Sequence, residues 1–280
     1  MTHNTTHIAF IGFGEVGQRF ARDLSAVDGV RLSTYDIVFD DRTLSASHAA
    51  RAAALGVVVA PDPADACRGA DIVISAVTAD QTGRVAETAA VFLTSRQVFF
   101  DVNSASPATK QRAAKAVEAA GAAYIEGAVM APVLKPGIRV PILAGGPDAE
   151  RVSEVLNGLG MNVTPVAREH GRASAIKLCR SIVIKGLEAL MVDCAAATRH
   201  FGVESEVYGS LTGTFPSIDW PALAEDMNER VATHGIRRAA EMREAADMLR
   251  ESGLEPALAE AVAAAQQRGA MVSRKPIEGK

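Results

Sequence analysis

The chain has 280 residues, of which 48% are hydrophobic and 22% are charged, as in folded globular proteins of two ordinary domains or one large one. Its formal net charge is −4 and it contains no block of like charge. This argues against a basic nucleic-acid-binding surface and a polybasic membrane patch. We therefore expect a small-molecule partner, with no nucleic acid and no membrane.

The cysteines and histidines predict no metal site. Cys67, Cys179 and Cys194 are odd in number and widely spaced, which favours free thiols over a disulfide frame or a zinc site. The histidines lack a ligand spacing such as HExxH. The chain shows neither a basic start followed by a long apolar run nor a later stretch of about 20 apolar residues. These features predict a cytoplasmic protein.

Short apolar runs alternate with amphipathic segments up to about residue 166, as in βα units on a mainly parallel sheet. Ser106 and Pro107 predict the start of a helix, because serine caps a helix and proline suits its first position. Gly121 is predicted to end that helix. Eight strands are predicted, at residues 7–11, 30–35, 57–59, 71–77, 97–101, 123–127, 140–144 and 161–166.

The strand pattern stops near Gly171, and alanine-rich helical sequence follows. We therefore predict a Rossmann-like, doubly wound α/β domain over residues 1–166 and an all-helical domain for substrate binding and oligomerisation over residues 167–280. The segment 172–202 is apolar on most faces, which predicts a buried helix with buried cysteine thiols that packs against both domains.

Two further helical features are predicted after that segment. A charged amphipathic block runs from Ala222 to Leu249, and the stretch 253–256 is expected to end it and start another helix, through a glycine and a proline. The tail 273–280 is expected to fray.

A glycine-rich turn follows the first predicted strand and leads into a helix. Gly12 permits a tight turn, Gly14 lets the backbone approach a pyrophosphate, and Gly17 lets the helix pack closely. Free N–H groups and the positive end of the helix dipole would then face anionic oxygens. We predict a dinucleotide site here, with a structural glycine turn as the alternative. Its residues are Gly12, Phe13, Gly14, Glu15, Val16 and Gly17.

Asp36 ends the second predicted strand, near the offset at which a carboxylate binds the adenosine ribose. A carboxylate there would repel the 2′-phosphate of NADP and bond the free hydroxyls of NAD. NAD is therefore the favoured cofactor, and acidic Asp40 and Asp41 add to that preference. NADP stays possible if Arg42 binds a 2′-phosphate while Asp36 turns aside.

Lys177 lies on the apolar helix with Ser181 and Glu188 on nearly the same face. Partial burial lowers the pKa of an ammonium, so Lys177 is a candidate to exchange a proton with an alcohol or carbonyl oxygen. The alternative is a lysine that reaches solvent or forms a structural ion pair with Glu188. Periodicity alone does not separate the two interpretations.

The order of these motifs resembles the β-hydroxyacid dehydrogenase family, which includes 3-hydroxyisobutyrate and 6-phosphogluconate dehydrogenases, over nearly the whole chain. HIAFIGFGEVGQRFA is similar to the family's cofactor turn. The resemblance implies that the backbone at Val77 and Thr78 runs past the cofactor and that Ser104 lies beside the nicotinamide half. It also implies that Asn103 binds the cofactor and that Arg237 lies near it. The helical domain looks like a short, poorly characterised variant of the family.

The same resemblance implies that Lys177 is catalytic. It implies substrate contacts for Ser104, Ala128, Val129, Met130 and Ser181. Ser181 replaces the family's usual asparagine and Met130 a serine, so the substrate pocket is expected to differ, with Lys135 a candidate for the lost anion contact. Ile184 stands where 6-phosphogluconate dehydrogenases carry a glutamate, which disfavours decarboxylation by their route.

Several residues keep two interpretations. His234 and Arg238 share a helix face and either clamp an anion or form a solvated basic face bonded to Glu241 and Glu244. Trp220 is expected in the core more than in a substrate cleft.

Taken together, the sequence predicts an NAD(P)-dependent oxidoreductase. We expect hydride transfer between nicotinamide and a small hydroxy acid or its carbonyl counterpart, in a cleft between the two domains, with Lys177 as general acid/base. The alternatives are an imine reductase on the same scaffold and a non-catalytic NAD(P)-binding protein. Excess apolar surface on segment 172–202 predicts a homodimer or higher homo-oligomer.

Overall fold

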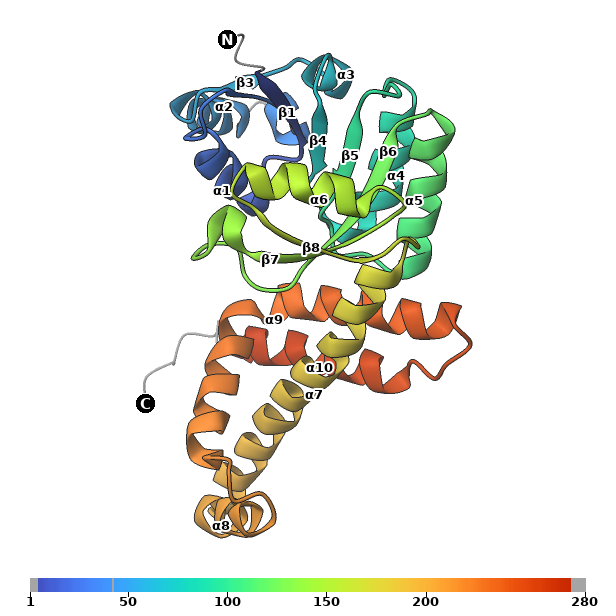
Figure 1. The fold of residues 1–280 in the computed structure, drawn as a ribbon. Coiled ribbons are helices and arrows are strands. Elements are labelled where there is room, and N and C mark those ends of the chain that lie inside the picture. The colour runs from blue at the N-terminus through green and yellow to red at the C-terminus, as the bar shows by residue number, and fades with distance from the viewer. Residues whose placement is uncertain (1–4, 42, 273–280) are drawn as a thin grey trace. The chain divides into compact units, whose positions relative to one another are not determined.

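The computed structural model describes residues 5–41 and 43–272. Arg42, the residue that would favour NADP, and the tail 273–280 lie outside the described residues. The chain forms two compact units that divide between Lys177 and Leu178. Figure 1 traces the elements of each unit.

The first unit is built on an eight-stranded sheet with the order β3-β2-β1-β4-β5-β6-β7-β8. β7 is antiparallel to β6, and the other neighbouring strands are parallel, which confirms the predicted mainly parallel sheet. The strands are β1 (Thr6–Ile11), β2 (Val30–Tyr35), β3 (Val57–Val59), β4 (Ile72–Ser75), β5 (Val98–Asp101), β6 (Ala123–Val129), β7 (Pro141–Gly145) and β8 (Asn162–Ala167).

Both faces of the sheet are buried, as in a doubly wound fold. Along β1, Ile8 and Phe10 belong to one apolar cluster while Ala9 and Ile11 belong to another, because successive strand residues point to opposite faces. The helices of this unit are α1 (Glu15–Leu24), α2 (Ser45–Ala54), α3 (Pro63–Cys67), α4 (Thr82–Ala90), α5 (Pro107–Ala119) and α6 (Ala149–Gly158), with 3₁₀ turns η1 (Ile37–Asp40), η2 (Ala79–Gln81) and η3 (Gly137–Arg139).

The predicted limits of α5 are confirmed. The Ser106 hydroxyl accepts a hydrogen bond from the Thr109 N–H at 3.3 Å, and Pro107 is the first helical residue. Gly121 follows the helix with a φ of +89°, a conformation that only glycine adopts without strain. Serine, proline and glycine therefore set this helix locally.

The second unit is helical. Its helices are α7 (Arg172–Phe201), which begins in the first unit, α8 (Glu204–Thr214), α9 (Trp220–Glu251) and α10 (Ala257–Val272). Gly253, with a φ of +70°, and Pro256 separate α9 from α10 as predicted. Trp220 is buried with Met191, Tyr208 and Met227, which confirms its place in the core.

The expectation that α7 is buried is wrong for one of its faces. Val183 is 68% exposed and Leu190 is 69% exposed. Cys179 is exposed and Cys194 half-buried, so neither is the buried thiol that was predicted. An apolar helix sequence shows that a face needs cover, but it does not show that the same chain supplies it.

A search of the helices in residues 5–41 and 43–272 finds none with the length and the apolar character of a membrane span.

Candidate functional site

The glycine-rich turn connects β1 to α1, and two of its glycines are required by packing. Gly12 has a φ of +96°, and a Cβ added there would lie 2.3 Å from the Ala76 carbonyl oxygen. A Cβ on Gly17 would lie 2.5 Å from the Gly12 oxygen, so a larger residue would push α1 away from the strand. These contacts supply the tight turn and the close helix packing that the sequence predicted.

Gly14 differs from the other two glycines. Its φ is −75°, and a Cβ built on it would meet no described protein atom within 4 Å. It is the N-cap of α1, and among the described residues no side chain caps the free N–H groups of that helix. Protein packing therefore does not require glycine at this position. An anion bound closely at the helix start would require it, because a side chain would lie in the space of the anion.

The Asp36 carboxylate ties the end of β2 to this turn. It accepts hydrogen bonds from the Phe13 N–H at 2.6 Å and from the Val38 N–H at 2.9 Å. A carboxylate has about four acceptor sites, so Asp36 keeps capacity for ribose hydroxyls. The neighbouring Tyr35 hydroxyl donates to Asp40 at 2.7 Å, which raises the pKa of Tyr35 to about 12.

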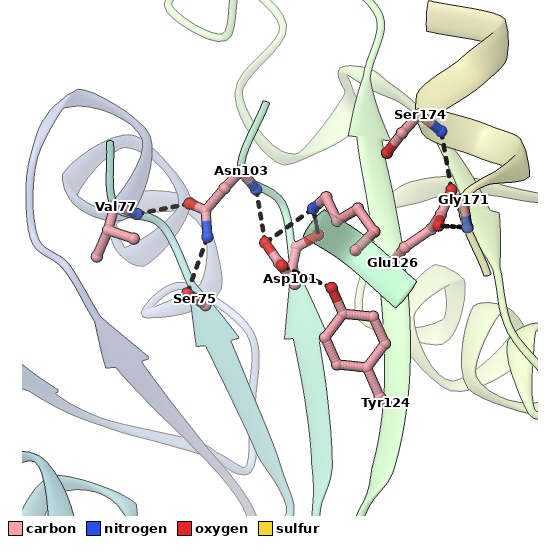
Figure 2. Close-up of polar contacts among 9 residues, drawn as sticks. Ser75, Val77, Asp101, Asn103, Tyr124, Glu126, Gly171 and Ser174 are labelled. Carbon is pink, nitrogen blue, oxygen red and sulfur yellow. Dashed lines mark hydrogen bonds and ion pairs between the residues drawn. The ribbon is translucent and has the colours of Figure 1, made fainter. Parts of the chain in front are cut away.

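Asn103 braces the ends of β4 and β5 (Figure 2). Its side-chain oxygen accepts from the Val77 N–H at 2.6 Å, and its nitrogen donates to the Ser75 hydroxyl at 3.0 Å. Asn103 is buried, so its amide positions the backbone at Val77. Thr78 is exposed. The Ser104 hydroxyl oxygen is buried and has no hydrogen-bond partner among the described residues.

A fully buried ion pair lies behind this brace, and sequence reasoning missed it. Lys110 of α5 lies 2.9 Å from an Asp101 carboxylate oxygen, and the Tyr124 hydroxyl donates to the other oxygen at 2.6 Å. Burial is the largest cause that raises the pKa of Tyr124 well above its usual value, with the Asp101 charge next. Lys110 lies on the α5 face that also buries Ala113, Ala114 and Val117, which was the available signal.

Glu126 of β6 connects the sheet to the start of α7 (Figure 2). One of its oxygens accepts from the Ser174 N–H at 2.8 Å, and the other accepts from the Gly171 N–H. Glu126 and Ala128 are buried, whereas Val129 and Met130, where the strand ends, are half-buried. Lys135, the candidate anion contact, is exposed.

The polar face of α7 contains a second lysine that sequence reasoning missed. The Lys185 ammonium donates to the Ser181 hydroxyl at 3.1 Å and pairs with Glu241 of α9 at 2.8 Å. Lys185 lies one turn beyond Ser181, which itself lies one turn beyond the half-buried Lys177. This four-residue spacing was the signal in the sequence that the polar face of α7 continues beyond Ser181.

Glu188 belongs to a buried network of the second unit. It pairs with Arg238 of α9 and accepts from the Gln266 side chain at 3.0 Å. These partners replace the predicted Lys177–Glu188 bridge as the account of Glu188. Arg238 thus contacts a buried carboxylate of another helix, a partner that neither interpretation of Arg238 named. His234 and Arg237 are exposed.

The predicted cofactor residues of the first unit gather where parallel strands end. The glycine turn, Asp36, Val77 and Asn103 follow β1, β2, β4 and β5, and the carboxyl ends of parallel strands are where such sheets bind ligands. Ser181 and Arg237 belong to the second unit. Within the described residues, no group of three or more His, Cys, Asp or Glu residues could hold a metal ion.

Comparisons with known proteins agree with this geometry. Residues 7–167 match the NAD binding domain of 6-phosphogluconate dehydrogenase. The chain belongs to that family. Residues 197–269 match a domain of unknown function, DUF1932, so the chain is a short-form member with a poorly characterised helical domain.

Two solved structures are similar over almost the whole chain. A conserved hypothetical protein from Sinorhizobium meliloti is 38% identical, covers 98% of this chain and 92% of its own, and has a TM-score of 0.83. The conserved protein MTH1747, described as structurally similar to 3-hydroxyacid dehydrogenases, is 31% identical, covers 96% of this chain and 100% of its own, and has a TM-score of 0.75.

More distant structures share the fold. Mycobacterium tuberculosis 3-hydroxyisobutyrate dehydrogenase is 18% identical with a TM-score of 0.75 and covers 95% of this chain and 94% of its own. A Bacillus cereus imine reductase is 19% identical with a TM-score of 0.58 and covers 95% and 94%. The chain thus has an NAD(P)-binding, dehydrogenase-like fold related to 3-hydroxyacid dehydrogenases and imine reductases.

Proposed function

We propose that this protein is an NAD(P)-dependent oxidoreductase that interconverts a small hydroxy acid and its carbonyl counterpart. The observation that carries the proposal is Gly14, a glycine that packing does not require, at a helix start that no side chain of residues 5–41 and 43–272 caps. The turn and Asp36 fit a dinucleotide, which would lie with its phosphates on α1 and its ribose near Asp36. When bound, the nicotinamide supplies or accepts the hydride.

In this proposal Lys177 moves the proton. The ammonium donates a proton to the carbonyl oxygen during reduction, and the neutral amine accepts it from the hydroxyl during oxidation. Ser181, one helical turn later, helps to orient that oxygen. Further substrate contacts come from Ser104 and from the end of β6, at Ala128, Val129 and Met130.

NAD is the proposed cofactor, with NADP as the alternative. Asp36 is already held by the Phe13 and Val38 N–H groups, so a rotation that would make room for a 2′-phosphate breaks two hydrogen bonds. The carboxylate also repels that phosphate. Fluorescence titrations with NADH and NADPH test this choice directly.

The proposal is tested by removing the Lys177 ammonium. We expect Lys177→Ala to lower kcat by about 10²-fold or more, the size of a general acid–base contribution, and to leave NADH affinity unchanged. Lys115→Ala, at an exposed lysine of α5, is the control. Assays use a panel of keto acids and semialdehydes. Near-normal turnover by Lys177→Ala would disprove the assignment.

An imine reductase is the second candidate, favoured by the shared fold with the Bacillus cereus enzyme. There the proton donor need not be a lysine. Cyclic imines added to the panel separate the candidates, because only this activity would reduce them faster than keto acids. Binding of NADH without turnover of any compound would instead indicate a non-catalytic nucleotide-binding protein.

We also propose a homodimer through α7. Val183 and Leu190, both about two-thirds exposed, are seven residues apart on one helix, the spacing that helices use to pack along each other. A two-fold symmetric pair would cover both copies of this stripe. We expect a dimer mass by light scattering at micromolar concentration and a monomer for Leu190→Glu. A monomeric wild type would contradict the proposal.

A further inference from the structure

The geometry points to Glu126 as a positioning residue that sets the direction in which α7 presents Lys177. Glu126 lies on β6, and its side chain is fully buried. Both carboxylate oxygens are used at the start of α7, one on Gly171, which immediately precedes the helix, and one on Ser174 in its first turn. The inference rests on the proposed role of Lys177 and adds a residue that acts on it through the backbone.

The two hydrogen bonds fix the start of the helix. The first N–H groups of a helix have no partner within the helix, and here one carboxylate accepts from two of them. Its negative charge also lies at the positive end of the helix dipole. Because a helix turns by 100° per residue, fixing Ser174 fixes the direction of the Lys177 Cα–Cβ bond three residues later.

Packing holds the Glu126 side chain in place. The opposing residue on β7 is Gly145, where an added Cβ would lie 3.1 Å from the Glu126 Cγ. At the helix start, a Cβ on Gly171 would lie 3.0 Å from the Pro107 Cβ. Glycine at position 145 therefore leaves the space for the Glu126 side chain, and glycine at position 171 lets the helix start lie against Pro107.

A positional role predicts a defect in turnover that exceeds any defect in binding. Glu126→Gln keeps the shape but replaces one acceptor oxygen with an NH₂ group, which faces a backbone N–H as a second donor. The first turn of α7 must then shift. A misplacement of about 1 Å costs up to roughly 10²-fold in rate, so we expect kcat to fall roughly 10- to 100-fold while the KM for NADH changes less than about twofold.

The experiment measures kcat, KM and hydrogen exchange in the full-length protein. Amides of residues 171–177 should exchange faster in Glu126→Gln than in wild type. The matched control is Glu118→Gln, at a half-exposed carboxylate that contacts the His170 ring at 2.7 Å and forms no hydrogen bond with the described residues of α7. It should leave both kcat and the exchange of residues 171–177 unchanged.

Each outcome decides the inference. A kcat of Glu126→Gln within twofold of wild type overturns it, even if exchange is faster. An equal fall in Glu118→Gln also overturns it, because the effect would then not be specific to the two backbone bonds. If Glu126→Gln fails to fold, Gly145→Ala decides, since it crowds the same side chain and should lower kcat in the same direction. Normal turnover by Lys177→Ala would remove the proposed function itself, whatever Glu126 does.

Discussion

The carboxylate of Asp36 accepts a hydrogen bond from the backbone N–H of Phe13, with 2.6 Å between the two heavy atoms. One side chain therefore joins the end of β2 to the glycine turn after β1. Phe13 itself is fully buried, so the carboxylate is held by a rigid partner. The residue proposed to choose between NAD and NADP is thus also a fixed part of the turn.

Asp36→Asn should relax the cofactor preference while keeping the turn. The amide oxygen still accepts from the Phe13 N–H, which keeps the bond to the turn. The NH₂ group can no longer accept from the Val38 N–H, and the charge that repels a 2′-phosphate is gone. We expect the ratio of the NADPH and NADH dissociation constants to fall on the order of tenfold, about 1.4 kcal/mol. Cofactor fluorescence measures both constants. An unchanged ratio would place the source of the preference elsewhere.

Alanine substitutions at Gly14 and Gly17 should affect different properties, NADH affinity at position 14 and stability at position 17. Gly14→Ala adds a methyl group where no described protein atom lies within 4 Å, so the Tm should stay near that of wild type while NADH binding weakens about tenfold or more. Gly17→Ala places a Cβ 2.5 Å from the Gly12 oxygen and should cost about 1–3 kcal/mol of stability. Thermal unfolding and NADH titration of both variants check this; intact NADH affinity in Gly14→Ala would argue against phosphate binding at this turn.

Replacing only the lysine of the buried Lys110–Asp101 pair should strongly lower the free energy of unfolding. Lys110→Met leaves the Asp101 carboxylate buried without its cation, and such changes cost about 3–5 kcal/mol. Arg151→Met, which breaks an exposed pair with Asp148 at 3.1 Å, should cost less than about 1 kcal/mol. Urea denaturation measures both. Similar losses in the two variants would contradict the difference in burial.

Alkaline pH should destabilise the protein through Cys67. Burial raises the pKa of this thiol from 9.0 to about 12, so above pH 9 the unfolded chain loses the proton while the folded protein keeps it. Stability is then lost as pH rises, by up to about 1.4 kcal/mol per unit between pH 9 and pH 12. Tyr124 acts in the same direction above pH 10. The free energy of unfolding, measured by urea denaturation at several pH values in this range, should fall less steeply with pH in Cys67→Ala than in wild type. An equal fall with pH in both proteins would rule out the thiol as a cause.

All eight strands were predictable because each is a short apolar run with a clear boundary, and local residues such as Ser106 and Gly121 set a helix without help from the rest of the chain. The glycine turn was equally readable, since its spacing fixes its geometry. The predicted burial of Cys179 failed because apolar periodicity identifies a face but not what covers it.

The missed residues share one physical feature, a partner on another helix or strand or on the backbone. A lone lysine such as Lys110 usually extends into solvent, and only the folded sheet brings it to Asp101. Lys185 pairs with Glu241 on another helix. Glu126 acts on backbone N–H groups, which every residue but proline carries, so no residue type marks its partners.

The order of Glu126 and α7 along the chain has a consequence for biosynthesis. Glu126 precedes Gly171 by 45 residues, so the ribosome releases the acceptor before the helix that it anchors. Because folding proceeds from the N-terminal region during synthesis, we expect the sheet to present a ready docking point as α7 emerges, and the helical region to depend on a correctly assembled sheet for the place where it starts.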